Sequence, residues 1–126
     1  MVTATDFLFK VAELQDDLRG VTDISDAKTV TETAERLEGL NYAPTVILPV
    51  ADFLRIKKID LLAKIEEIIS LSDEEVYELS PGDPRSYFDM KLQYIATLVY
   101  YFKQLVQLRR GNAEAWDEVD ELYVHD

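Results

Sequence analysis

The sequence of 126 residues contains no cysteine, and its single histidine is His125, next to the last residue. The lack of cysteine excludes disulfide bonds, cysteine metal sites and thiol catalysis. A lone histidine excludes histidine-based zinc sites and catalytic triads. Four glycines, at positions 20, 39, 82 and 111, each match a turn or a helix end, so no glycine-rich phosphate loop is present. We expect no cofactor.

An apolar run long enough to cross a membrane is also missing. The most apolar segment, residues 86–108 ("SYFDMKLQYIATLVYYFKQLVQL"), is interrupted by Asp89, Lys91 and Lys103. A membrane span needs roughly 20 largely uncharged residues. The first residues, "MVTATDFLFK", have no basic region leading into an apolar core, so we expect no signal peptide. These features predict a cytoplasmic protein, or an assembled particle made in the cytoplasm.

Positive charge is scarce. The chain has 13 Lys and Arg against 25 Asp and Glu, which gives a net charge of −12. Nucleic-acid binders need a basic surface to neutralise phosphates, and anionic lipid repels an acidic one. We therefore expect protein partners, no membrane binding and no nucleic-acid binding.

Helix signals recur along the whole chain. A first helix ends at Gly20, and its apolar positions repeat every three or four residues, at Phe7, Val11, Leu14 and Leu18. A second runs from an N-cap at Ser25 to Gly39, with Val30, Ala34 and Leu37 on one face. Residues 44–50, which include Pro44 and Pro49, are predicted to form an extended connector. A helical pattern follows from about Pro49 to residue 71.

Two capping signals bound the later helices. Ser72 and Glu75 form a capping box that starts a short helix ending near Leu79. Asp83 followed by Pro84 predicts the start of a long helix over about residues 84–110, with Gly111 as its stop. At 1.5 Å per residue this helix is about 40 Å long, as long as the whole domain is wide.

These signals predict an all-α protein. We expect one domain, residues 1–126, folded as a compact bundle of five or six helices around the long central helix. A last, acidic helix over about residues 112–124 follows Gly111 and is predicted to dock either on its own domain or on a partner.

Two groups of residues are candidates for partner binding. Tyr87, Tyr94 and Tyr101 repeat every seven residues along the long helix, and a tyrosine combines an apolar ring with a polar tip. The C-terminal helix has a short apolar stripe made by Trp116, Val119, Leu122 and Tyr123, surrounded by acids. Each group has an alternative role in packing within its own domain.

Carboxylates are the remaining route to catalysis. "EEVYE" places Glu75 and Glu78 on one helical face, and "EAWD" places Glu114 and Asp117 at the same spacing. The pattern is similar to the EExxE and ExxD motifs of the all-α nucleotide pyrophosphohydrolases. That resemblance implies magnesium held by these four residues and hydrolysis of nucleoside triphosphates. Acids at helix starts are equally expected because they interact favourably with the helix dipole.

The favoured interpretation is a non-catalytic structural or interaction protein. Size and helical plan suit a small subunit or adaptor of a larger, homo-oligomeric assembly, by analogy such as a phage head–tail connector. One alternative is an acidic inhibitor that mimics nucleic acid. The other is the magnesium-dependent pyrophosphohydrolase.

Overall fold

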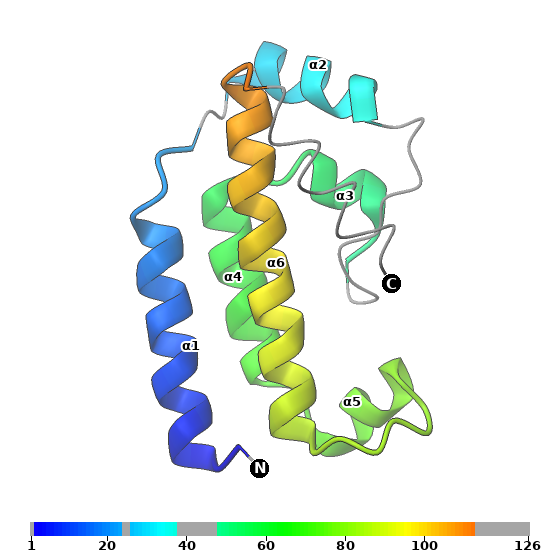
Figure 1. Cartoon of the computed structure of the whole chain (residues 1–126). Helices are drawn as coiled ribbons and strands as arrows, with labels where there is room; N and C mark the ends of the chain where they lie inside the picture. Colours follow the sequence, from blue (N-terminus) through cyan, green and yellow to red (C-terminus); the bar gives the residue numbers. More distant parts are fainter. Residues whose placement is uncertain (1, 24–25, 38–47, 113–126) are drawn as a thin grey trace.

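The fold is given by a computed structural model that describes residues 2–23, 26–37 and 48–112 (Figure 1). Every regular element in these residues is a helix, which confirms the all-α prediction. The six helices are α1 (Ala4–Arg19), α2 (Ala27–Leu37), α3 (Val50–Leu54), α4 (Lys58–Ile69), α5 (Asp73–Leu79) and α6 (Tyr87–Arg109).

Three helices form the body of the bundle. α1, α4 and α6 run side by side along most of their lengths, while α2 crosses one end and α5 lies at the other (Figure 1). α6 packs against α1, α2, α4 and α5. The largest fully buried side chains come from four helices, α1, α3, α4 and α6: Phe7, Leu18, Phe53, Leu54, Leu61, Ile65, Ile68, Met90, Ile95, Leu98, Phe102 and Leu105. Among the described residues, no helix is both long enough and apolar enough to cross a membrane.

Capping boxes begin two of the helices. In α5 the Ser72 hydroxyl accepts the Glu75 N–H at 3.2 Å, and the Glu75 carboxylate accepts the Ser72 N–H at 3.0 Å, as predicted. Thr3 and Asp6 form the same reciprocal pair at the start of α1. Each pair satisfies two backbone donors that a helix start leaves free, so these starts are determined locally.

The predicted starts of two other helices were wrong by a few residues. α2 begins at Ala27, one residue later than a cap at Ser25 predicts, and the Asp26 carboxylate accepts the Thr29 N–H at 2.9 Å. α6 begins at Tyr87 rather than residue 84. The Asp83 carboxylate accepts the Arg85 N–H at 3.0 Å and also pairs with the Arg85 guanidinium.

The cap of α6 is instead Ser86, whose hydroxyl accepts the Asp89 N–H at 3.3 Å. Asp83 is occupied by Arg85 in a turn, so it is not available to cap the helix. The predicted stop at Gly111 is confirmed, because Gly111 follows the helix with a left-handed φ of 89°. Gly39 lies outside the described residues, as does most of the predicted connector at 44–50.

The pattern from Pro49 to residue 71 forms two helices rather than one. α3 ends at Leu54 and α4 begins at Lys58. The carbonyl oxygens of Leu54 and Ile56 accept hydrogen bonds from the Arg109 guanidinium, at 3.3 and 2.7 Å. A side chain from α6 therefore satisfies backbone acceptors that a continuous helix would have used internally.

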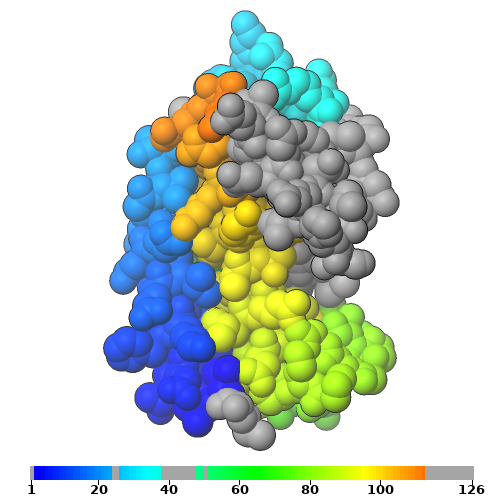
Figure 2. All heavy atoms as spheres, in the orientation of Figure 1, coloured from blue at the N-terminus to red at the C-terminus, as the bar shows by residue number. Residues whose placement is uncertain are grey.

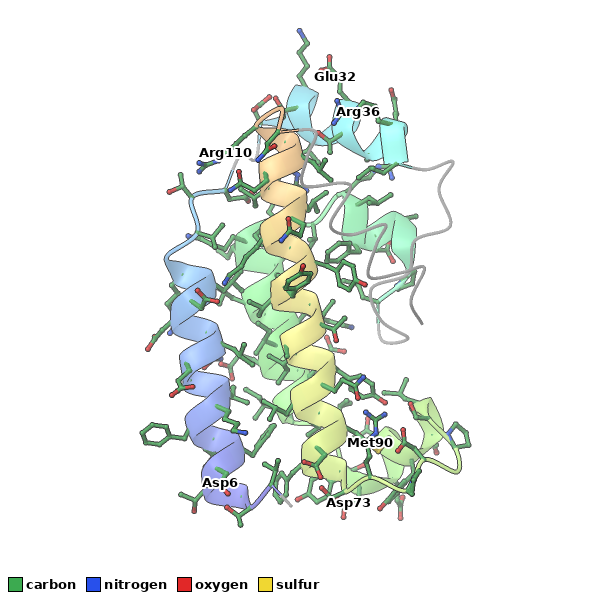
Figure 3. The ribbon with its side chains drawn as sticks, in the orientation of Figure 1. Asp6, Glu32, Arg36, Asp73, Met90 and Arg110 are labelled. Carbon is green, nitrogen blue, oxygen red and sulfur yellow. The ribbon has the colours of Figure 1, made fainter. Side chains whose placement is uncertain are left out.

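Asp23 completes this junction. Its carboxylate accepts the Arg109 guanidinium at 3.1 Å and the Lys58 N–H at 3.0 Å. The Lys58 ammonium donates to the carbonyl oxygens of Arg19 and Val21, at the end of α1. Arg110, which points toward the α1–α2 link, donates to the Thr22 carbonyl oxygen at 2.8 Å (Figure 3). The end of α6 thus holds two junctions in place, the one between α3 and α4 and the one between α1 and α2.

Candidate interaction surface

The predicted tyrosine row is divided by the packing of α6. Tyr94 is buried, and its hydroxyl forms a 2.7 Å hydrogen bond with the Ser80 hydroxyl. Tyr87 is partly buried and stacks on Phe88, with ring centroids 4.2 Å apart. Tyr101 is also partly buried. Of the three rings, those of Tyr87 and Tyr101 keep some accessible surface for another chain.

A different side of α6 faces outward. It carries six side chains at helical spacing, which we call the α6 face: Gln93, Ala96, Thr97, Tyr100, Gln104 and Gln107. Gln93 and Tyr100 are exposed, and the other four are partly buried. Figure 2 shows the middle of α6 (yellow) reaching the surface beside α1 (blue). The first and last of these residues are about 21 Å apart along the helix axis.

None of these six side chains is charged, although 30% of the residues of the chain are. The nearby charges on α6 are used elsewhere. Lys91 is buried, with its ammonium donating to the Ile69 carbonyl oxygen at 2.8 Å. Lys103 forms an ion pair with Asp17 of α1, and Asp89 accepts the Ser86 hydroxyl in the first turn. The α6 face is therefore an uncharged strip on a strongly acidic molecule.

A groove of about 480 Å³ between α1 and α6 adjoins this strip. Leu14, Leu92 and Ala96 supply its apolar lining, while Lys10, Glu13 and Asp17 of α1 supply the polar lining. Ala96 belongs to both the groove and the α6 face, so the two form one continuous surface. The α6 face has the composition of an interface core, which contains few charges and many tyrosines, whereas the groove places three charged side chains at its border.

The sequence contained the signal for this surface. Positions 93, 96, 97, 100, 104 and 107 lie within one arc of a helical wheel, and none is acidic in a chain with 25 acids. The tyrosine row is the more obvious candidate, because glutamines and a threonine on the polar side of a long helix are also typical of a solvated surface.

The predicted carboxylate site is only partly described. Glu75 serves the capping box, and the hydrogen bonds from Ser72 lower the pKa of its carboxyl. Glu78 follows one turn later in α5. The described residues include no group of three or more metal-ligating side chains. Glu114 and Asp117 lie outside the described residues, so the convergence of the two pairs remains untested.

The C-terminal partner-binding candidates also lie outside the described residues. These are the predicted helix at 112–124 beyond Asn112, and its stripe of Trp116, Val119, Leu122 and Tyr123. Their role in binding a partner remains a prediction.

Comparisons with known proteins give no further assignment. No protein-family model matches the chain, and no curated protein or solved structure does either.

Proposed function

We propose that this chain is a non-catalytic structural subunit that associates with other copies of itself through the α6 face. The observation that carries the proposal is the absence of charge from that face. Two molecules of net charge −12 repel one another. They can approach closely where acids are missing, and the α6 face offers such a strip with a tyrosine at its centre.

The spacing of the strip suits a two-fold symmetric contact. Tyr100 lies midway between Gln93 and Gln107, seven residues from each. In an antiparallel pair of α6 helices with the axis beside Tyr100, Gln93 lies opposite Gln107 of the second copy. A side-chain amide carries both donors and an acceptor, so these glutamines can hydrogen-bond to each other across the contact. Such a contact uses the same patch on both copies.

The size of the strip indicates a weak contact. A helix face about 21 Å long and 10 Å wide covers roughly 200 Å² per chain, far below the approximately 800 Å² per partner of a stable interface. We expect a dissociation constant of about 0.1–1 mM for an isolated pair. In a larger assembly, several such contacts on each subunit act together and strengthen binding.

Sedimentation velocity over a range of protein concentrations tests this proposal. We expect reversible association that disappears in Tyr100→Glu, because the substitution places two carboxylates face to face at the two-fold axis. Tyr77→Glu is the matched control. It makes the same exchange at an exposed tyrosine, 47% accessible, on α5.

The control should associate like the wild type, and both variants should keep the wild-type melting temperature. A chain that stays monomeric up to about 1 mM would contradict the proposal, since contacts weaker than this are not specific. Equal loss of association in the two variants would also contradict it, because the effect would then come from net charge alone.

A further inference from the structure

Helix α1 carries a second apolar stripe on the side away from the core. Its buried stripe is formed by Phe7, Val11 and Leu18. Leu8 and Phe9 are 61% and 70% accessible. Together with the exposed residues Thr5 and Ala12, they follow the spacing i, i+3, i+4, i+7, which places them on one outward side. We call Leu8, Phe9 and Ala12 the α1 patch.

This patch is a cluster rather than a scattered exposure. Five large apolar side chains are exposed among the described residues. Ile59, Tyr77 and Tyr100 are on three different helices, whereas Leu8 and Phe9 are adjacent. Isolated exposed apolar residues are normal on a protein surface, but a cluster with a polar border is typical of a contact site. A helix that is apolar on two opposite sides is usually covered on both.

Acids surround the patch. Asp6 precedes Phe9 by three residues and Glu13 follows it by four, so both lie beside its ring on the helix surface. Asp6 is in the first turn of α1 (Figure 3), and hydrogen bonds from Thr3 lower the pKa of its carboxyl. Glu13 has no ion-pair partner within the described part of the chain. Asp16, one turn further, pairs with Arg19 at 3.1 Å.

Two bases lie near the patch, fewer than the acids. Arg19 is paired with Asp16, and the exposed Lys10 lies one turn after Asp6, where its charge also lowers the pKa of the Asp6 carboxyl. The α4 side adds Glu66, which accepts a hydrogen bond from Gln15 at 2.8 Å. The α1 patch is thus an apolar centre with an acidic border.

We propose that the α1 patch docks a basic amphipathic helix of a partner protein, whose apolar side covers Phe9 and whose lysines or arginines face Asp6, Glu13 and Glu66. Charge complementarity selects this partner. A second copy of the chain would bring its own acids against these acids. Anionic lipid would be repelled for the same reason.

This docking is separate from self-association. The α1 patch points away from the α6 helix, so one subunit can use the two surfaces at once. The proposal therefore goes beyond the α6 contact and does not depend on it. A subunit with both surfaces would join copies of itself to a second, basic component.

A designed peptide provides the probe for a direct test. We would use an 18-residue helix with leucines on one side and lysines on the other, together with a version in which glutamate replaces every lysine. Binding would be followed by NMR chemical-shift changes in the full chain. We expect the lysine peptide to shift amides of residues 5–16 and the glutamate peptide to shift none.

Substitutions locate the site. Leu8→Ser with Phe9→Ser should weaken peptide binding about 10- to 30-fold, as expected for loss of an apolar anchor. Ile59→Ser, at a side chain that is 74% accessible on α4, is the matched control and should leave binding unchanged. Glu13→Lys should weaken binding more than Glu32→Lys, the same exchange at an exposed residue of α2 (Figure 3).

Several results would overturn the proposal. It fails if the lysine peptide does not bind, if both peptides bind equally, or if the Leu8/Phe9 double variant binds as well as the Ile59 control. Binding of phosphatidylserine vesicles through the same residues would assign the patch to membranes instead. Concentration-dependent association abolished by Phe9→Ser would assign it to a second copy. Tyr100→Glu should leave peptide binding intact, which separates this outcome from failure of the α6 contact.

Discussion

Replacing Asp23 tests the junction between α3 and α4 most directly. Its side chain is 9% accessible, and that of its partner Arg109 is fully buried. In Asp23→Ala the guanidinium stays buried without its carboxylate, although it still donates to the Leu54 and Ile56 carbonyl oxygens. Removing one member of a buried ion pair costs about 3–5 kcal/mol. The Lys58 N–H loses its acceptor in the same substitution.

We therefore expect the free energy of unfolding to fall by about 4 kcal/mol. For a chain of this length that corresponds to a melting temperature about 15 °C lower. Urea denaturation followed by circular dichroism measures the change. Asp16→Ala is the control, because the Asp16–Arg19 pair is exposed, with side chains 78% and 57% accessible. An exposed pair contributes less than about 1 kcal/mol.

A double-mutant cycle with Arg109→Met isolates the interaction between the two side chains. Methionine removes the buried charge while keeping much of the volume, so the double variant should be more stable than the sum of the single losses predicts. We expect a coupling of about 2 kcal/mol. If Asp23→Ala were no more destabilising than Asp16→Ala, or if the two losses simply added, the junction would not depend on this ion pair.

Two further predictions concern the turns. Gly111→Ala should cost about 1–2 kcal/mol in thermal unfolding, because Gly111 has a φ of 89° that an L-residue adopts only with strain. Gly20→Ala should change stability by less than about 0.5 kcal/mol, since Gly20 has an ordinary helical φ of −72°; equal costs would exclude backbone strain as the cause. Hydrogen bonds from Arg85 lower the pKa of Asp83 to about 2 from its usual 3.8, so this turn should keep its ion pair at neutral pH and lose it only as the pH falls through about 2. NMR titration of the Asp83 carboxyl should give that midpoint, and Arg85→Gln should move it back toward 3.8; an unchanged midpoint would contradict the assignment.

Sequence patterns predicted the helices that are determined by nearby residues. The capping box of Ser72 and Glu75 acts over three positions, and the apolar stripe of α1 needs only its own periodicity. The same holds for the stop at Gly111, where a glycine follows two arginines. These features can be recognised without knowing what the helices pack against.

The break between α3 and α4 could not be predicted in this way. It depends on Asp23, which lies 35 residues before Lys58, and on Arg109, which lies 53 residues after Ile56. Hydrophobic spacing continues across the break, and only the fold brings the distant side chains to the free backbone groups. At Asp83 a nearby residue caused the error instead. The Asp83 carboxylate resembles a helix cap in the sequence, but it accepts a hydrogen bond from the neighbouring Arg85 guanidinium.

The interaction surfaces were hidden for a different reason. A row of tyrosines attracts attention, but burial decides which of its members a partner can reach, and Tyr94 is 6% accessible. Likewise, the spacing of the stripe that begins at Phe7 places Leu8 and Phe9 off it, but only the fold shows that they are 61% and 70% accessible. Exposure is a property of the tertiary packing, so sequence alone supplies the candidates and the fold selects among them.

A last prediction concerns Lys91, whose buried charge should contribute much less to the free energy of unfolding than the buried charge of Arg109. The side chain is 4% accessible, and burial lowers the pKa of its ammonium, against the opposing effect of Asp73 and Glu75. The folded state therefore holds this proton less tightly than the unfolded chain does. Stability should rise as the pH increases toward the unfolded pKa, and at neutral pH the buried charge carries a cost.

Lys91→Met removes that cost together with one hydrogen bond, to the Ile69 carbonyl oxygen. A hydrogen bond from a charged group contributes about 1.5–3 kcal/mol, and relief of the desolvation cost offsets much of its loss. We expect the free energy of unfolding to change by less than about 1 kcal/mol, and the increase in stability at alkaline pH to disappear. Lys91→Ala should cost about 2–3 kcal/mol, because it also leaves a cavity. Urea denaturation measures these changes. If Lys91→Met were as destabilising as Asp23→Ala, the Lys91 ammonium would be as important to the fold as the Arg109 guanidinium. Stability would then not depend on the number of acceptors that each cation contacts.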